Sequence, residues 1–306
     1  MSKVKKVAAV VVTYNRLDML KENLEGLCKQ KYKDLDIILI DNASTDGTGE
    51  YIKKLNFSNL IYINTGKNLG GAGGFYHGVK EASIRGYKYA WIMDDDTIPY
   101  EDSLDQLMIS AKKLNNDFSF LCSYVEWIDH NPCYMNEPRI FSSKWFKFSN
   151  LLCDSLLAVR SCTFVSVLIN LEVASKAGLP LKELFIYGDD HEYTERLSKF
   201  ANGYLSFNSK VLHKMKENTG FDIVNVSSDR ISRYYYDSRN RVYRAKKIGI
   251  LEFIYTIIWY IIVKFRILFN SNDKKIKRIY VIVKGFYAGL FFNPKVEYVN
   301  KISKEK

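Results

Sequence analysis

The sequence predicts an α/β protein organised around a doubly wound sheet. Short apolar, β-branched runs alternate with helical patterns along the first hundred residues. These runs are continuous, which is typical of strands that are buried on both faces of a parallel sheet. Each run ends in polar residues, and sheets of this kind bind ligands beyond the carboxyl ends of their strands. The fold class therefore also predicts where a functional site lies.

The predicted elements of the first half follow this order. A strand at residues 7–12 precedes a helix that carries Leu17, Leu20, Leu24 and Leu27 on one face. Further strands are expected at residues 36–40 and 60–63, with helices around 49–54 and 76–85, and a fourth strand ends at Asp94. In the second half we expect helices at 101–114 and 192–199 and strands at 118–125, 164–169 and 204–207.

The segment between residues 126 and 157 shows no regular pattern and is rich in aromatic side chains. Long segments of this kind often serve as substrate-binding excursions from a compact domain. Surface structure with a small core of its own fits the sequence equally well.

Composition narrows the class of protein. A hydrophobic content of 47% excludes wholesale disorder. The five cysteines are scattered and form no CxxC pair, which favours reduced thiols in a cytosolic setting. Residues 1–6 lead directly into the first strand without an apolar signal region, so we do not expect secretion.

The positive charge is concentrated at the C-terminal end. Residues 1–220 contain 27 Lys and Arg and 27 Asp and Glu, whereas residues 221–306 contain 18 basic and seven acidic residues. The net charge of +11 therefore lies entirely in the last part of the chain. This asymmetry predicts an anionic partner, either nucleic acid or the inner face of a membrane.

Two apolar segments lie within this basic region. Residues 230–247 predict a basic, tyrosine-rich helix, and residues 250–269 and 279–292 are apolar. The longest uncharged run, residues 253–263, has eleven residues and is too short to span a bilayer. We expect helices lying in the membrane interface, and the alternative is a buried helix pair.

Two acidic motifs indicate a chemical site. Asp94, Asp95 and Asp96 follow an apolar strand, and adjacent carboxylates repel one another unless a cation such as Mg²⁺ or Mn²⁺ compensates them. Asp189 and Asp190 precede a helix, whose dipole favours their ionised forms. The simpler alternatives are a solvated acidic turn and a helix cap. His213 is either a structural residue or a nitrogen ligand that completes a carboxylate metal site.

A glycine-rich segment follows the third strand. Four of the five residues from Gly70 to Gly74 are glycine, and the spacing matches neither a P-loop nor GxGxxG. Glycines let the backbone approach a ligand closely and offer its N–H groups. A tight turn is the alternative.

These motifs together resemble the family 2 glycosyltransferases, which have the GT-A fold. The resemblance covers residues 7–213, about two thirds of the chain. It rests on VVVTYNR at 10–16, LIDNASTDGT at 39–48, NLGGAGGF at 68–75, WIMDDDT at 91–97 and YGDDHEY at 187–193. The glycine-rich and DDD motifs especially resemble the bacterial rhamnosyl- and galactofuranosyltransferases. The resemblance implies a Rossmann-like, mostly parallel mixed sheet with helices on both faces. The basic and apolar segments after it predict an α-helical region that associates with membrane.

The resemblance also implies roles for individual residues. Asp190 would be the catalytic base, and Asp189 would orient the acceptor. Asp94, Asp96 and His213 would bind Mn²⁺ or Mg²⁺. Tyr187-Gly188 stands where relatives often carry a tryptophan, which leaves stacking of the acceptor open. The nucleotide-sugar would be bound by Thr13, Asn15, Arg16, Asp41 (through the pyrimidine base), Asn68, Gly71, Gly74, Asp94 and Asp95.

The predicted function is that of an inverting, metal-dependent glycosyltransferase. It would move galactofuranose or rhamnose from a UDP- or dTDP-sugar to a lipid-linked saccharide in bacterial cell-surface polysaccharide synthesis. We expect residues 1–220 to form the catalytic domain, and residues 221–306 to hold it on the cytoplasmic face of the plasma membrane. The alternatives are a nucleotidyltransferase acting on sugar phosphates and a basic nucleic-acid-binding protein.

Overall fold

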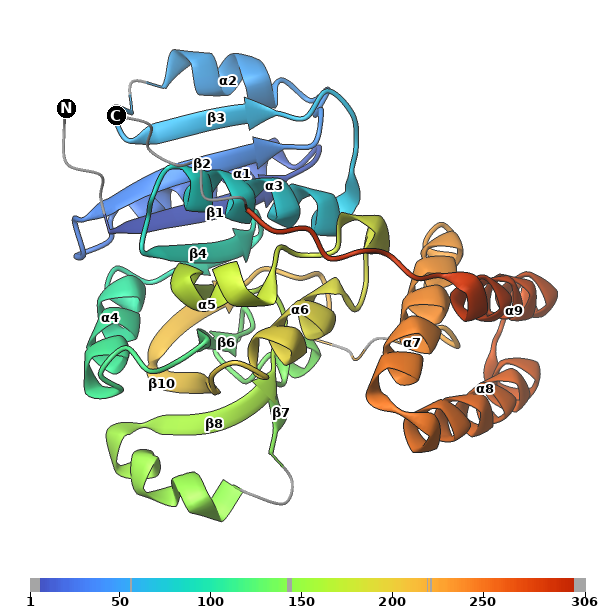
Figure 1. Ribbon diagram of the computed structural model, residues 1–306. Helices are drawn as coiled ribbons and strands as arrows, with labels where there is room; N and C mark the ends of the chain where they lie inside the picture. The colour runs from blue at the N-terminus through green and yellow to red at the C-terminus, as the bar shows by residue number, and fades with distance from the viewer. Residues whose placement is uncertain (1–5, 56, 142–144, 219, 221, 300–306) are drawn as a thin grey trace.

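The computed structural model describes residues 6–55, 57–141, 145–218, 220 and 222–299. Its centre is one mixed sheet with the strand order β3-β2-β1-β4-β9-β6-β10-β8-β7, and β5 pairs with β10 (Figure 1). The strands are β1 (Val7–Thr13), β2 (Leu35–Asp41), β3 (Leu60–Asn64), β4 (Tyr89–Asp94), β5 (Thr97–Pro99), β6 (Phe120–Glu126), β7 (Arg139–Ile140), β8 (Leu156–Ser161), β9 (Val167–Asn170) and β10 (Gly203–His213).

The four strands from β3 to β4 are parallel, as the continuous apolar runs predict. Beyond β4 the sheet is mixed, because β9 runs antiparallel to both β4 and β6, whereas β10 runs parallel to β6. The predicted mixed α/β sheet is confirmed. The parallel half places the carboxyl ends of β1, β2, β3 and β4 along one edge.

Helices cover both faces of the sheet. Side chains of α1 (Leu17–Cys28), α2 (Thr48–Lys54) and α4 (Ser103–Lys113) belong to one buried core. Those of α3 (Gly70–Ile84), α5 (Leu171–Ala177) and α6 (Asp189–Leu197) belong to the core on the opposite face. Side chains along the central strands point alternately into one core and the other, as a sheet covered by helices on both faces requires.

The glycine-rich segment differs from its prediction. We expected a loop followed by a helix from about residue 76, but α3 begins at Gly70. Close packing explains the glycines, because a Cβ at Gly74 would lie 2.4 Å from Val12 Cγ1 and one at Gly78 would lie 2.1 Å from Val10 Cγ1. The glycines therefore let this helix approach the central strand, which a sequence pattern of polar and apolar residues does not reveal.

Two other stretches are more ordered than expected. The strand predicted at residues 204–207 extends to His213, with a shift in its register against β6 between Ser206 and Lys210. The segment at 126–157 contains a short strand, β7, and the 3₁₀ turns η1 (Tyr134–Asn136) and η2 (Trp145–Asp154). A further 3₁₀ turn, η3 (Lys182–Leu184), precedes α6.

The C-terminal helices stand beside the sheet (Figure 1). They are α7 (Tyr234–Ile248), α8 (Ile250–Asn270) and α9 (Lys275–Phe291), preceded by the 3₁₀ turn η4 (Ile231–Arg233), and they share a core of their own. In the described part of the chain, no helix is both long and apolar enough to cross a membrane. After α9 the chain returns to the sheet domain, where Leu179 N donates to Glu297 O at 2.8 Å.

Candidate active site

The polar residues at the strand ends meet at one edge of the sheet. In the parallel register Val12 lies beside Asp94, Thr13 beside Asp41, and Asp41 beside Asn64. Each of these residues is at or next to the end of its strand, so the predicted convergence is confirmed. Asp94, Asp95 and Asp96 form what we call the carboxylate cluster.

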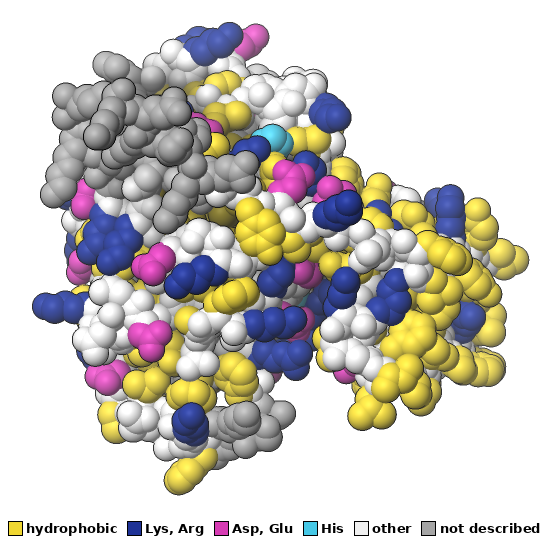
Figure 2. All heavy atoms as spheres, viewed as in Figure 1, with side chains coloured by type: hydrophobic (Ala, Val, Ile, Leu, Met, Phe, Trp, Pro, Cys, Tyr) yellow, Lys and Arg dark blue, Asp and Glu magenta, His cyan; other side chains and the backbone are white. Residues whose placement is uncertain are grey.

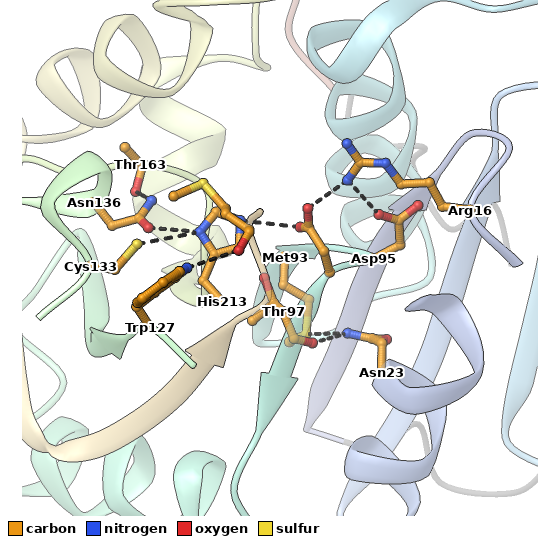
Figure 3. Close-up of polar contacts among 12 residues, drawn as sticks. Arg16, Asn23, Met93, Asp95, Thr97, Trp127, Cys133, Asn136, Thr163 and His213 are labelled. Atoms are coloured by element: carbon orange, nitrogen blue, oxygen red, sulfur yellow. Dashed lines mark hydrogen bonds and ion pairs between the residues drawn. The ribbon is translucent and has the colours of Figure 1, made fainter. Parts of the chain in front are cut away.

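Arg16 and Thr13 hold two members of the carboxylate cluster, and Figure 3 shows the contacts of Arg16. Thr13 Oγ1 donates to Asp95 Oδ2 at 2.8 Å. One Arg16 guanidinium nitrogen donates to Asp96 Oδ2 at 2.6 Å and to Asp95 Oδ1 at 3.3 Å. Both residues come from the end of β1 or directly after it, which places a positive charge against the carboxylates.

His213 approaches the carboxylate cluster from the end of β10 (Figure 3). Its Nε2 lies 3.2 Å from Asp96 Oδ1. Asn136 Nδ2 donates to Thr163 Oγ1 at 2.8 Å, so Asn136 Oδ1 is left to accept from His213 Nδ1, also at 2.8 Å. This arrangement fixes the ring and directs Nε2 toward Asp96. Sequence reasoning missed Asn136, which lies in the irregular segment and carries no motif.

Burial and crowding shift the pKa values of the cluster in different directions. Burial and the neighbouring Asp96 and Asp95 raise the pKa of Asp94 to about 8. Burial also raises the pKa of Asp95 to about 6, against the opposing effect of Arg16. Burial opposes ionisation of Asp96, yet His213 and Arg16 hold its pKa below the usual range. Asp96 in turn overcomes burial and raises the pKa of His213 to about 10.

These shifts show which charge is compensated and which is not. The charge of Asp96 is compensated by Arg16 and His213. Asp94 has a strongly raised pKa and a side chain that is partly exposed. Two carboxylates and an imidazole suit a divalent cation such as Mn²⁺ or Mg²⁺. No three His, Cys, Asp or Glu side chains within the described ranges already stand at metal-binding distances. The donor types fit the cation, with Arg16 and His213 now supplying the positive charge at Asp96.

Asp41 and Asn15 organise the loop after β2. Asp41 is fully buried, and its carboxylate accepts from Ser44 N at 2.8 Å and from Tyr62 Oη at 2.6 Å. Asn15 Oδ1 accepts from Thr45 N at 2.7 Å. Beside them lies a hollow lined by Ser44, Thr45, Gly47, Gly49, Glu50, Lys53, Tyr62 and Asn64. This hollow opens next to the strand edge.

The two glycines predicted to bind the nucleotide-sugar, Gly71 and Gly74, have different surroundings. Gly71 has open space where a Cβ would lie, whereas Gly74 packs against Val12. Asn68 Oδ1 accepts from Gly70 N at 2.8 Å and thereby shapes the start of α3. Gly71 is accessible to a ligand, and Gly74 positions the helix.

The second acidic motif begins α6, and residues 184–188 before it form what we call the α6 loop. Phe185, Tyr187 and Gly188 have left-handed φ angles of 66°, 67° and 78°. Asn240 of α7 holds this loop, because its Nδ2 donates to the carbonyls of Leu184, Ile186 and Tyr187 at 3.0, 3.1 and 2.8 Å. Sequence reasoning missed Asn240, which lies about fifty residues away in the basic helix.

The α6 loop brings Asp189 toward the carboxylate cluster. Burial, then Asp190 and in smaller measure Asp94, raise the pKa of Asp189 well above its ordinary value. Asp190 is half-buried, and its Oδ1 accepts from His191 N at 2.6 Å. Ala72 N at the start of α3 donates to Phe185 O of the α6 loop at 3.1 Å, so the second acidic motif, about 95 residues from the first, begins beside the same edge of the sheet.

The family model "Glycosyl transferase family 2" matches residues 8–168, just over half of the chain. The chain belongs to this family. Galactofuranosyltransferase GlfT1 of Mycolicibacterium smegmatis is 26% identical over 204 residues, which cover 62% of this chain and 65% of the relative. The chain thus spans less than two thirds of the length of that relative.

Solved structures support the same fold. Residues 1–349 of S. aureus TarS in complex with UDP-GlcNAc have a TM-score of 0.54 at 14% identity, covering 92% of this chain and 71% of that TarS chain. GalNAc-T7 with UDP, GalNAc and Mn²⁺ has a TM-score of 0.58 at 14% identity, covering 80% of this chain and 51% of GalNAc-T7. At these identities the likeness concerns the fold alone, and it confirms the GT-A architecture that the family 2 motifs predict.

Proposed function

We propose that this protein is an inverting, metal-dependent glycosyltransferase. It transfers galactofuranose or rhamnose from a UDP- or dTDP-sugar to a hydroxyl of a lipid-linked saccharide in bacterial cell-surface polysaccharide synthesis. The observation that carries the proposal is the meeting of two acidic motifs, the carboxylate cluster and Asp189–Asp190, at the carboxyl edge of the sheet. Family membership favours glycosyl transfer over the nucleotidyltransferase and nucleic-acid-binding alternatives.

The nucleotide-sugar would lie along the strand edge. Asp41, Asn15 and Thr13 would bind the base and ribose, and Asn68 and Gly71 would border the diphosphate or sugar. Gly74 would support them, because its close packing on Val12 places α3. Asp94, Asp96 and His213 would hold Mn²⁺ or Mg²⁺, which supplies positive charge opposite the diphosphate. Arg16 adds a fixed positive charge, and Asp95 orients it.

Asp190 would act as the base on the acceptor. A base must be reachable by the hydroxyl that it deprotonates, and Asp190 is half-buried whereas Asp189 is 8% exposed. Asp190 takes the hydroxyl proton as that oxygen attacks the anomeric carbon, and the bond to the diphosphate oxygen breaks. One displacement inverts the configuration. Asp189 would orient the acceptor.

Galactofuranose is favoured because the galactofuranosyltransferase GlfT1 is among the proteins similar to this chain. Rhamnose stays in the proposal, since uracil and thymine offer the same edge to Asp41. Peripheral binding to the inner face of the plasma membrane is supported by α8, where Leu251 is 81% and Phe269 79% exposed. Exposed apolar residues flanked by basic ones are typical of interfacial helices.

A donor screen tests the function. UDP-galactofuranose, dTDP-rhamnose, UDP-GlcNAc and GDP-mannose are each supplied with Mn²⁺ and a saccharide acceptor, and the released nucleotide and the glycosylated product are measured. We expect one pyrimidine nucleotide sugar to give product of inverted configuration, and chelation by EDTA to stop the reaction. Product of retained configuration, or full activity in EDTA, would overturn the mechanism.

A further inference from the structure

A small cavity lined by arginines lies where the C-terminal helices meet the sheet domain. Figure 2 shows basic and acidic side chains gathered around a hollow there, beside the hydrophobic surface of the C-terminal helices. Its lining includes one acidic residue, Glu252, which is exposed. The lining residues are Arg139, Arg241, Arg244, Ala245, Ile248, Glu252, Tyr255, Thr256 and Trp259.

The arginines have fewer acidic partners than their charge requires. Glu195 Oε1 forms an ion pair with Arg244 at 2.9 Å. Nitrogens of Arg139 and Arg160 lie 3.7 and 4.0 Å from the same oxygen. Asp237 pairs with Arg241 at 3.4 Å. Within the described ranges, the buried Nε atoms of Arg241 and Arg244 have no hydrogen-bond partner. Guanidinium groups with free donors suit phosphate oxygens in both charge and planar geometry.

The cavity lies close to the proposed base. Glu195, which holds the arginines, is on the same helix as Asp190, and five residues of helix rise by roughly 7 Å. Burial and the neighbouring Arg244 and Arg241 lower the pKa of Arg139, and Asp190 is near enough to oppose this shift. A group bound by the arginines would therefore lie within reach of Asp190 through a short saccharide.

The other side of the cavity is continuous with an exposed apolar surface. Tyr255 lines the cavity and is 64% exposed, and Ile258 and Ile262 continue the exposed row along α8. The Arg241 guanidinium lies 4.1 Å from the centroid of the Trp259 ring. The molecule thus places, in order, a carboxylate, an arginine cavity and an apolar helix face.

We propose that this arginine cavity binds the phosphate group of the lipid-linked acceptor. The hydrocarbon chain then lies along α8, and the saccharide extends toward Asp190. This inference rests on the proposed function, and it adds a phosphate-bearing lipid as the acceptor class. The headgroup of a bulk anionic phospholipid offers the same chemistry, but we favour the acceptor because the cavity lies beside Asp190.

Acceptor selectivity tests the inference. Transfer is compared between one saccharide linked to a short prenyl diphosphate and the same saccharide linked to an uncharged octyl chain. In Arg241→Gln we expect KM for the diphosphate acceptor to rise about tenfold or more, as for the loss of one charge-assisted hydrogen bond, with KM for the octyl acceptor unchanged. Arg266→Gln is the matched control, since Arg266 is also a C-terminal arginine but pairs with Asp222 outside the cavity lining. Equal changes with both acceptors, or an equal loss in Arg266→Gln, would overturn the inference.

A binding measurement keeps the two proposals separable. Farnesyl diphosphate and uncharged farnesol are titrated against Trp fluorescence, which Trp259 beside Arg241 should report. We expect saturable binding of the diphosphate that Arg241→Gln weakens, whether or not any donor is turned over. Equal affinity for farnesol refutes the phosphate site. Binding to vesicles of phosphatidylcholine, with and without phosphatidylglycerol, tests whether the cavity binds bulk anionic lipid instead. If Arg241→Gln weakens binding only to the anionic vesicles and leaves the affinity for farnesyl diphosphate unchanged, the acceptor-phosphate proposal is refuted.

Discussion

The carboxylate cluster and the Asp189–Asp190 pair, which directly follows the α6 loop, are the two acidic motifs of the proposed site, but they are held in place differently. The cluster follows β4, whose register with β1 fixes its position, and its partners Thr13 and Arg16 come from the end of β1. The α6 loop has residues at positive φ and depends on Asn240 of α7. Left-handed backbone at non-glycine residues is unfavourable and persists only where the surroundings enforce it.

This difference assigns a structural role to the C-terminal region. Asn240 and Arg239 both bond backbone carbonyls of the segment that leads into α6, so α7 helps to position Asp189 and Asp190. The division at residue 220 stays a prediction, but a chain cut there would lose the support of the α6 loop. Four predictions test whether the carboxylate cluster and the α6 loop have separate functions, beginning with the largest expected effect.

Asp190→Asn should reduce turnover by about 10²- to 10⁴-fold, the usual contribution of a general base. Donor binding should be unchanged, because the proposed donor site is at the carboxylate cluster. Turnover is measured as product formation, and donor affinity by calorimetry. Asp189→Asn is the comparison, and we expect it to raise the acceptor KM more than it lowers turnover. Retained turnover in Asp190→Asn would remove that residue from its assigned role.

Asp96→Ala should weaken nucleotide-sugar binding at least about tenfold in the presence of Mn²⁺, since a cation opposite phosphate oxygens is worth several kcal/mol. The effect should be smaller without Mn²⁺. The measurement is donor affinity with and without the metal. An affinity that Mn²⁺ improves equally in the wild type and in Asp96→Ala would exclude Asp96 as a ligand.

Two buried asparagines provide a matched pair. Asn240 bonds the α6 loop, and Asn23 Nδ2 donates to Thr97 O at 2.6 Å, next to the carboxylate cluster (Figure 3). Leucine at either position should cost about 1–3 kcal/mol of stability, because buried carbonyls lose their donor. We expect Asn240→Leu to lower turnover with donor affinity retained, and Asn23→Leu to weaken donor binding. Thermal melts and calorimetry check both. If both variants lost turnover and donor affinity to the same extent, the carboxylate cluster and the α6 loop would not have separate functions.

The sequence predicts the carboxylate cluster better than the α6 loop for a physical reason. Strand ends follow from local apolar patterns. The sequence alone therefore predicts that Thr13, Asp41 and Asp94 lie at the same edge of the sheet. Asn240 and Asn136 act through contacts that are distant in sequence, and a single asparagine carries no local pattern. The early start of α3 was missed for a related reason, because the glycines serve helix–sheet packing that only the assembled fold requires.

The smallest expected effect compares two histidines whose pKa values shift in opposite directions. His213, beside the carboxylate cluster, has a pKa raised to about 10, so the stability it contributes is lost as pH rises from 6.5 toward that value. Burial lowers the pKa of His191 below 6.5, although the neighbouring Asp190 opposes this, and Ser161 Oγ lies 2.9 Å from its Nδ1. Because the unfolded chain takes up the proton first, the contribution of neutral His191 is lost as pH falls below 6.5.

His191→Gln should therefore reduce the loss of unfolding free energy between pH 7 and pH 5. Glutamine can retain a hydrogen bond to Ser161 but does not titrate, and a single proton accounts for at most about 1.4 kcal/mol per pH unit. Denaturant unfolding of the wild type and the variant at each pH measures the difference in slope. His130→Gln is the control, since this histidine is 69% exposed in its side chain. Parallel slopes for wild type and His191→Gln would show that His191 has the same pKa in both states, and that protonation beside Asp190 does not destabilise the α6 region.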